Sequence, residues 1–295
     1  MKIKSADALD GIRRKAAKAL SVRETSKRVG AMKTSGLEQG TPHIQILCCG
    51  GTGCKASESA KIVENFRASI AAHGITDKVD VVVTGCFGFC EKGPIVKIMP
   101  DNTFYTSVRP ADVEEIVTQH IIGGNKVERL LYLDPGNGRH ISDSKHMNFY
   151  RKQMRVALRN CGVINPEDIT EYIGRYGYRA LAESLKRDSQ EVLDDIKASG
   201  LRGRGGAGFP TGTKWEIARK FKSEDKYVVC NADEGDPGAF MDRSIMEGDP
   251  NSIVEAMTIC GYCIEAHHGL IYSPSRSPPR RGRIGRKTPR PRLRR

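Results

Sequence analysis

Apolar residues recur at helical spacing near the start of the chain. They lie three or four positions apart, at Leu9, Ile12, Ala16 and Leu20. Ser5 precedes them as a candidate N-cap, so the pattern predicts an amphipathic helix within residues 5–29. Residues 36–42 contain Gly36, Gly40 and Pro42, which predicts a linker after this helix.

Short apolar runs alternate with helical patterning from residue 43 onward. The runs typical of strands are HIQILC (43–48), VDVVVTG (79–85), PIVKIM (94–99) and TFYTSV (103–108). Helical patterning fills residues 57–74 and 110–122, where Gly74 ends the first helix and Pro110 begins the second. The order β, α, β, β, β, α predicts a thioredoxin-like layer of helices on a small mixed sheet.

Beyond residue 122 the pattern changes twice. Residues 123–150 carry GGN and DPGNGRH, which are typical of an interdomain linker. Helical patterning then fills 148–199, a glycine-rich loop follows at 200–215, and YVVCN (227–231) and residues 252–269 predict a buried strand and a further helix. We therefore expect an α/β protein organised as an N-terminal helix and linker (1–42), a thioredoxin-like domain (43–122), a linker (123–150), an incomplete α/β domain (151–272) and a disordered basic tail (273–295).

Composition supports a two-domain globular protein. The 295 residues suffice for two cores, and 38% hydrophobic with 28% charged residues is typical of soluble domains. No run of about 18 apolar residues predicts a transmembrane helix. The first twenty residues lack the apolar centre of a secretory signal, so we expect a cytoplasmic protein.

The net charge of +13 is distributed unevenly. Residues 273–295 hold nine Arg, one Lys and no acid, so they carry +10 and the first 272 residues carry only +3. Nucleic-acid binding by the globular part is therefore not expected. The alternative is confined to the tail, as a basic arm for nucleic acid or an acidic partner.

The cysteines carry the clearest chemical pattern. An odd number of them, nine, in a chain without an export signal argues against disulfides. Cys49 and Cys54 form C-x4-C after the first predicted strand, and Cys86 and Cys90 form C-x3-C after the second. Four thiolates on two loops can converge on a metal, and spacings wider than the C-x2-C usual for zinc favour a 2Fe-2S cluster. A structural zinc module with a basic arm is the less favoured alternative.

Glycines surround these four cysteines, in CGGTGC and GCFGFCEKG. They let the backbone approach closely and aim amides at cluster sulfurs. The remaining cysteines are assigned to packing: Cys48 to the core, Cys161 to a helix, Cys230 to a strand, and Cys260 and Cys263 to a helix. His267 and His268 are interpreted as partners of a helix C-terminus.

CGGTGC together with TGCFGFCEKGP resembles the thioredoxin-like 2Fe-2S ferredoxin domain of diaphorase subunits. The likeness continues without a gap through PADVEEIVTQHIIGGNKVERLLY. The plant-type ferredoxin spacing is not met.

Two later segments indicate a nucleotide or flavin site. Residues 200–215 hold six glycines, whose amides can approach phosphate oxygens, with Arg202, Arg204 and Lys214 supplying positive charge. The spacing matches neither a Walker loop nor G-x-G-x-x-G, so an ordinary loop stays possible. The predicted strand at 227–231 ends in polar groups that suit ribityl or ribose hydroxyls, a cation or a solvated turn: Asn231, Asp233, Glu234 and Asp236.

Together these segments closely resemble the FMN and NADH site of the flavoprotein subunit of respiratory complex I and its relatives. The resemblance implies that FMN and the nicotinamide nucleotide contact Gly203, Arg204, Gly205, Gly206, Ala207, Gly208, Phe209, Gly212 and Lys214. It implies that Asn231, Asp233 and Glu234 hydrogen-bond the flavin. Phe209 would stack on the cofactor and Asp236 would lie beside the nicotinamide, so the candidate catalytic residues are Phe209, Glu234 and Asp236.

The implied activity is hydride transfer from NAD(P)H to FMN, followed by electron transfer to iron-sulfur clusters. An N-terminal 2Fe-2S domain fused to the FMN domain resembles the NAD(P)-linked subunit of multimeric, often electron-bifurcating, hydrogenases or formate dehydrogenases more than the respiratory subunit, and the hydrogenase type is named first. Partners would be ferredoxin-like and iron-sulfur subunits of such a complex.

The likeness ends at Tyr272. The mixed-charge helix and the four cysteines of a 4Fe-4S cluster that the family carries further on do not follow. An acid-free Arg/Pro/Ser tail is typical of an out-of-frame reading, so we hypothesise a frameshift near codon 273. If the second domain holds no FMN, the alternative is a 2Fe-2S electron carrier.

Overall fold

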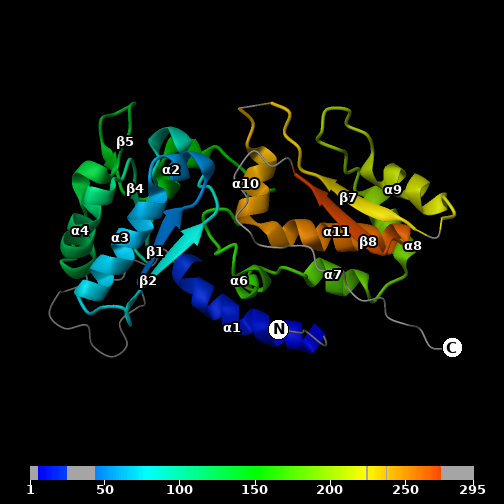
Figure 1. Ribbon diagram of the computed structural model, residues 1–295, viewed down its shortest axis with the longest axis horizontal. Helices are drawn as coiled ribbons and strands as arrows, with labels where there is room; N and C mark the ends of the chain where they lie inside the picture. Colours follow the sequence, from blue (N-terminus) through cyan, green and yellow to red (C-terminus); the bar gives the residue numbers. More distant parts are fainter. Residues whose placement is uncertain (1–5, 25–43, 224, 237, 274–295) are drawn as a thin grey trace.

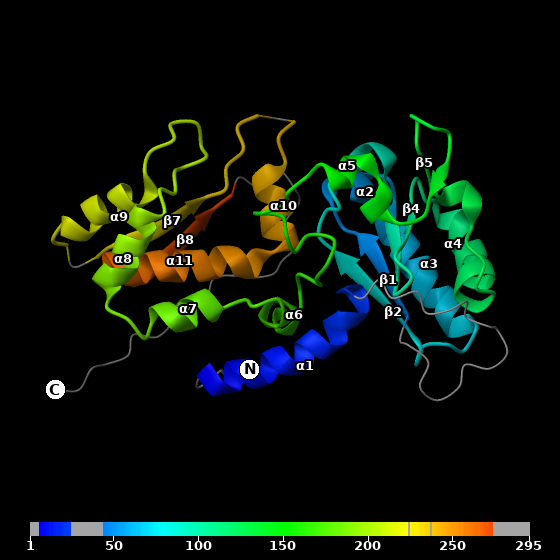
Figure 2. The ribbon, with the colours of Figure 1, turned by 180° about the vertical axis from the view of Figure 1, so that it is seen from behind.

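Two α/β halves lie next to one another, and helix α1 (Ala6–Glu24) runs beneath both of them (Figures 1 and 2). The computed structural model describes residues 6–24, 44–223, 225–236 and 238–273. The expected helix is found. The expected cap at Ser5, the linker at 36–42 and the tail from 274 onward lie outside the described residues.

A four-stranded mixed sheet forms the centre of the first half. Its strands are β1 (Ile44–Cys49), β2 (Val79–Thr84), β3 (Val96–Met99) and β4 (Thr103–Tyr105). Their order is β2-β1-β3-β4, with β1 and β2 parallel and the other neighbours antiparallel. This confirms the expected mixed sheet and the β3–β4 hairpin.

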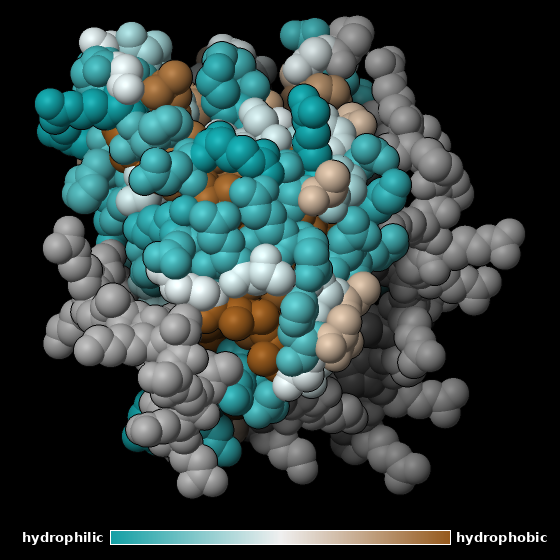
Figure 3. Space-filling view, turned by 90° about the vertical axis from the view of Figure 1, so that its left-hand side faces the viewer, coloured by the Kyte–Doolittle hydropathy of each residue, from teal (hydrophilic) through white to brown (hydrophobic). Residues whose placement is uncertain are grey.

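Helices cover one face of this sheet. Their bounds are α3 (Ser59–Ala72), α4 (Val113–Glu115) and the π-helical turn η3 (Ile116–Ile122). The short helix α2 (Thr52–Ala56) follows β1, and its buried Cys54 packs in the cluster on the other face. Ile62, Phe66 and Ile70 of α3 are almost fully buried, at one position per helical turn, against the inward side chains of β1 and β3. Each such side chain stabilises the fold by roughly 1.5–3 kcal/mol. Figure 3 views this outer side, where the exposed surface is mainly hydrophilic.

The segment at 123–150 differs from the expected linker. It forms a small hairpin, β5 (Tyr132–Leu133) with β6 (His140–Ile141), and a short helix, α5 (Asn148–Arg151). Met147 is fully buried against the second face of the sheet, in a cluster with Leu47 and Phe104. Apolar side chains between the glycines and prolines therefore fold this segment onto the first half.

The second half is mainly helical. Its helices are α6 (Ile169–Gly174), α7 (Arg179–Ser184), α8 (Ser189–Ala198), α9 (Thr211–Lys220), α10 (Met241–Gly248) and α11 (Pro250–Ile264). Strands β7 (Tyr227–Asn231) and β8 (His268–Tyr272) pair in parallel, and α8, α9 and α11 share a small core with them.

Four expectations for this half are corrected. Residues 211–215 begin α9 instead of ending the loop, and Cys161 lies in a turn instead of a helix. Strand β7 is not buried, because its outward residues, such as Val229 at 57% exposure, have no layer packed on them among the described residues. His268 belongs to β8 and stacks on Tyr227, since α11 ends at Ile264.

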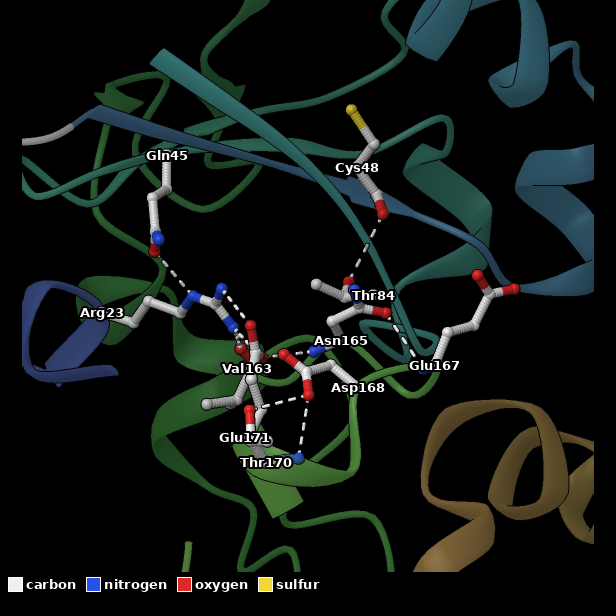
Figure 4. Close-up of polar contacts among 10 residues, drawn as sticks. All are labelled: Arg23, Gln45, Cys48, Thr84, Val163, Asn165, Glu167, Asp168, Thr170 and Glu171. Carbon is white, nitrogen blue, oxygen red and sulfur yellow. Dashed lines mark hydrogen bonds and ion pairs between the residues drawn. The ribbon is translucent and has the colours of Figure 1, made fainter. Parts of the chain in front are cut away.

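A buried ion pair joins α1 to both halves (Figure 4). The Arg23 guanidinium donates to Glu171 of α6 through two nitrogens, at 2.5 and 2.8 Å. It also donates to Gln45 Oε1 in β1 at 2.7 Å and to the Val163 carbonyl at 2.7 Å. The Arg23 side chain is only 3% exposed, so its charge depends on Glu171.

We expect Glu171→Gln to destabilise the protein by about 3 kcal/mol, because it leaves a buried guanidinium without its counter-charge. Urea denaturation would measure this loss. The matched control is Glu183→Gln, whose carboxylate is about 60% exposed and should change the midpoint little. Equal effects of the two substitutions would contradict a joining role for Arg23.

Candidate functional site

The parallel pairing of β1 and β2 brings the two cysteine loops together. Cys49, the last residue of β1, lies in register with Thr84, the last residue of β2. The Gly50 amide donates to the Thr84 carbonyl at 2.9 Å, which holds the loops against one another. Parallel strands end at the same edge of a sheet, so the thiols that follow them meet there.

The four thiols form a connected string. Cys49 contacts both Cys54, in α2, and Cys86, on the loop after β2. The Cys86 and Cys90 sulfurs lie 3.8 Å apart. Cys49 and Cys54 are buried, Cys86 is partly buried and Cys90 is exposed, so the string runs from the interior to the surface.

Burial and mutual contact make most of these thiols hard to ionise by themselves. The hydrogen bond with Cys54 raises the pKa of Cys49 to about 12, and the same bond lowers the pKa of Cys54. The hydrogen bond with Cys49, followed by burial, raises the pKa of Cys86. Backbone amides of Phe87, Gly88 and Ile95 point at the sulfurs and favour the thiolate forms. A bound metal core could displace the protons and use these amides.

Two glycines keep the space around the sulfurs open. A Cβ on Gly51 would lie 2.9 Å from Cys86 Cβ, and one on Gly93 would lie 2.8 Å from Cys54 Sγ. Larger residues would have to displace the thiols. The expectation that glycines line this loop pair for close backbone approach is met at these two positions.

The four thiols are the donor set that the site offers to a metal. They contact one another in succession along two loops. Four cysteine sulfurs can hold either a tetrahedral zinc ion or the two-iron core of a 2Fe-2S cluster. Cys48 faces the opposite side of β1 and is buried in the core, as expected.

The glycine-rich loop is closed at its base and open at its tip. The Gly203 amide donates to the Phe209 carbonyl at 2.9 Å, and Thr211 donates to Leu201 at 2.8 Å. Gly206 and Gly208 adopt positive φ angles of 104° and 60°, which favour glycine. The tip from Gly203 to Ala207 is exposed, as are Phe209 (49%) and Lys214. Backbone amides and the Arg204 side chain are thus available to an anionic ligand.

Gly212 has a different setting from the rest of the loop. It is buried in the first turn of α9, and a Cβ there would lie 2.5–2.7 Å from Lys197 of α8. This glycine permits close packing of two helices, which explains it without a cofactor contact.

The acidic residues after β7 divide into two groups. Asn231 accepts the Asp233 amide at 3.1 Å, and the side chains of Asn231, Asp233 and Asp236 are exposed. Glu234 instead accepts the amides of Asp242 and Arg243, at 2.8 and 3.4 Å. Its carboxylate therefore caps the start of α10. The acidic and glycine-rich loops project from the same side of the second half (Figures 1 and 2).

The cysteine loop after β2 packs directly on the second half, a contact that sequence reasoning missed. The Arg155 guanidinium donates to the Phe87 carbonyl at 2.9 Å and, at 3.3–3.4 Å, to the carbonyls of Cys86 and Cys161. Gly85 lies so close to Gly248 that a Cβ on it would be 2.6 Å from the Gly248 Cα. A lone arginine in a basic stretch gives no signal of such contacts, so only the fold could identify them.

Sequence models of two known families match the two halves. The thioredoxin-like [2Fe-2S] ferredoxin model matches residues 37–120, and the Nuo51 FMN-binding domain model matches residues 196–281. The first covers the cysteine loops, and the second covers the glycine-rich and acidic loops.

Individual relatives match parts of the chain. Over 122 residues, 41% of this chain and 25% of the relative, the chain is 60% identical to the NADP-reducing hydrogenase subunit HndC of Solidesulfovibrio fructosivorans. Over 118 residues, 40% of this chain and 28% of the relative, it is 45% identical to a subunit of the NADH-quinone oxidoreductase of Rhizobium meliloti. Parts of the chain are thus similar to the thioredoxin-like [2Fe-2S] ferredoxin family, to the Nuo51 FMN-binding domain family and to subunits of hydrogenases and NADH-quinone oxidoreductases.

The chain spans about a quarter of the length of the curated relatives that it matches. The NAD-reducing hydrogenase HoxS subunit alpha of Cupriavidus necator is 33% identical over 190 residues, 64% of this chain and 29% of that protein. Among solved structures, the thioredoxin-like [2Fe-2S] ferredoxin of Aquifex aeolicus is 31% identical over 30% of this chain and 95% of its own, with a TM-score of 0.29. No helix in the described part of the chain is long and apolar enough to cross a membrane.

The contact between the first half and the second half of the chain can be tested at Gly85. We expect Gly85→Ala to destabilise the protein by about 1–3 kcal/mol, because the new Cβ overlaps Gly248 and crowds Cys161 Sγ at 3.2 Å. Urea denaturation would measure the loss, and faster reaction of Cys161 with a thiol reagent would show that the contact has opened. Gly235→Ala is the control, since a Cβ there meets no atom within 4 Å. An unchanged Cys161 rate in Gly85→Ala would disprove the tight contact.

Proposed function

We propose that this chain is an NAD(P)H-oxidising diaphorase subunit that passes hydride to FMN and electrons onward to a 2Fe-2S cluster held by Cys49, Cys54, Cys86 and Cys90. One observation carries the proposal. The four thiols lie on two neighbouring loops. The loop that carries Cys86 packs on the half that contains the glycine-rich loop (200–215) and the acidic residues after β7.

The ferredoxin half would supply the ligands and the setting of the cluster. When bound, a 2Fe-2S cluster exchanges one electron at a time. The amides of Phe87, Gly88 and Ile95 already point at three of the sulfurs and would stabilise the negative charge of the thiolates. Burial of Cys49 and Cys54 would keep water from that side of the site, while the exposed Cys90 marks its outer edge.

The second half would bind the flavin phosphate and sugar chain. The exposed amides from Arg204 to Ala207, with the Arg204 and Lys214 side chains, are suited to phosphate oxygens. Asn231 and Asp233 are free to accept hydrogen bonds from hydroxyl groups, and Phe209 offers a ring for stacking. We assign Asp236 to the nicotinamide side.

Two residues take revised roles in this proposal. Glu234 would act as a positioning residue, because its carboxylate already binds two amides of α10 and so fixes the acidic loop. Gly212 would act through helix packing. The reactants would thus be oriented by Phe209 and Asp236 from loops that the scaffold holds at their bases.

The physiological setting would be a multimeric hydrogenase of the type in which HndC is a subunit. The 60% identity to HndC over 122 residues supports this, as does the order of the two domains in one chain. Other iron-sulfur subunits would be the partners.

A 2Fe-2S electron carrier without flavin is the second candidate. It is supported by the open face of the β7–β8 sheet, where Tyr227, Val229 and Leu270 are half exposed, so that the described FMN segment lacks a closed core. The ferredoxin half has a complete core of its own and does not share this weakness.

The decisive experiment is visible spectroscopy of anaerobically purified protein, with iron, sulfide, zinc and flavin assays. Iron, sulfide and flavin bands bleached by NADH or NADPH would support the diaphorase. Iron and sulfide without flavin would favour the electron carrier. Zinc without iron would disprove the cluster.

Replacement of one proposed ligand should remove the cluster. We expect Cys86→Ser to retain less than about a tenth of the wild-type iron and sulfide, because the string of thiols is broken in the middle. Cys48→Ser is the control, since that thiol lies in the core on the other face of β1. Equal iron contents in Cys86→Ser and wild type would rule out Cys86 as a ligand.

The flavin site can be tested at the two ends of β7. We expect Asp233→Asn to weaken FMN binding about tenfold or more, because a charged hydrogen-bond acceptor contributes roughly 1.5–3 kcal/mol. Asp225→Asn, before the strand, should change the affinity less than about twofold. Quenching of FMN fluorescence would measure both. If Asp225→Asn weakened FMN binding as much as Asp233→Asn, the flavin would not lie at the carboxyl end of β7.

A further inference from the structure

A cavity of about 310 Å³ lies between the first sheet and the chain that leads into the second half. Lys97 in β3 and Phe104 in β4 form one wall. Residues 144–163 form the opposite wall, and Phe87 of the cysteine loop borders the cavity. The cavity therefore adjoins the contact between the two halves without including any of the four proposed cluster ligands.

The lining of this cavity is strongly basic. Four cationic side chains border it, namely Lys97, Lys145, Arg151 and Arg155, and no acidic residue does. Residues 144–166 contain no Asp or Glu at all. Asp143 lies near Lys97, but its Oδ1 accepts the Lys145 amide at 2.8 Å and the Asn102 side-chain amide. The positive charge around the cavity thus greatly exceeds the negative charge.

Acidic neighbours among the described residues compensate the charges of Lys97 and Arg155 only in part or not at all. Burial lowers the pKa of Lys97 to about 8, and Asp143 offsets this only in part. Arg155 donates only to neutral carbonyl groups among the hydrogen bonds of the described residues. Placing cations where burial disfavours them reduces stability unless something binds there.

We propose that this cavity is a binding site for a phosphate group. Lys97, Arg151 and Arg155 line the cavity and no acidic side chain does, which favours a dianion over a carboxylate. The rings of Phe104 and Tyr150 add an apolar wall, which suits a phosphate carried on an aromatic or other apolar group. This site is separate from the glycine-rich loop and does not depend on the diaphorase function.

A ligand there would bridge the two halves. Lys97 belongs to the ferredoxin sheet, whereas Arg155 is bonded to the cysteine loop and to Cys161 at the start of the second half. Binding to the assembled form alone would stabilise the contact between the halves in proportion to ligand concentration. Phosphate binding would thus be linked to the docking of the proposed electron-transfer partners within this chain.

Isothermal titration of the full chain with inorganic phosphate and with phenyl phosphate would test the site, at constant ionic strength set with chloride. We expect both to bind, with phenyl phosphate tighter because of the apolar wall. Lys97→Met and Arg151→Gln should each weaken binding at least tenfold. Lys152→Gln is the matched control, because it removes the neighbouring charge outside the lining and should change the affinity less than twofold.

A further measurement keeps the test decisive. Lys97→Met should unfold at the wild-type temperature or above, since it removes a partly buried charge, so loss of binding could not be attributed to unfolding. Absence of binding in wild type, or weakening by Lys152→Gln equal to that by Lys97→Met, would overturn the proposal.

Discussion

The register between β1 and β2 determines where the chemistry of this protein can occur. Because the strands are parallel and Cys49 stands opposite Thr84, both cysteine loops leave the sheet at one edge and within one residue of each other. A shift of one position would turn Cys49 toward the core and Cys48 toward the loop, since side chains alternate along a strand. The buried Ile44 and Ile46 on the same strand fix that register through packing.

The position of the second half depends on contacts of another kind. The halves are joined at two separate places. At one, the buried Arg23 pairs with Glu171, and at the other the backbone of Gly85 lies directly against Gly248. Neither contact tolerates a small displacement, because one needs a counter-charge within hydrogen-bond distance and the other has no room for a methyl group. The loop that carries Cys86 is therefore held by the half that carries the flavin-type segments.

Much of the ferredoxin half could be predicted from the sequence, because alternation in its strands and the helical spacing of Ile62, Phe66 and Ile70 reflect one packed core. The hairpin at 123–150 could not, since its Gly- and Pro-rich turns obscured isolated apolar residues such as Met147. The end of α11 was also missed. Glu265 adopts the left-handed conformation there, where a glycine would have marked the end in the sequence.

The candidate site was predictable in its residue types and less so in its roles. The sequence shows that four cysteines follow two predicted strands, and this pattern alone predicts a metal site. The capping role of Glu234 depends on where α10 begins, which the sequence does not show. Arg155 donates to backbone carbonyl groups of residues that are distant in sequence, such as Phe87. A pattern of side-chain types cannot predict such hydrogen bonds.

The graded exposure of the four thiols has a consequence for biogenesis. The apolar core beneath α3 is complete without any of these four sulfurs, and Cys90 already faces solvent. Loading of the proposed cluster would therefore leave this core intact, while the two loops and the packing of Cys49 and Cys54 on the other face of the sheet rearrange. Maturation of the proposed centre would then follow folding of the first core in time.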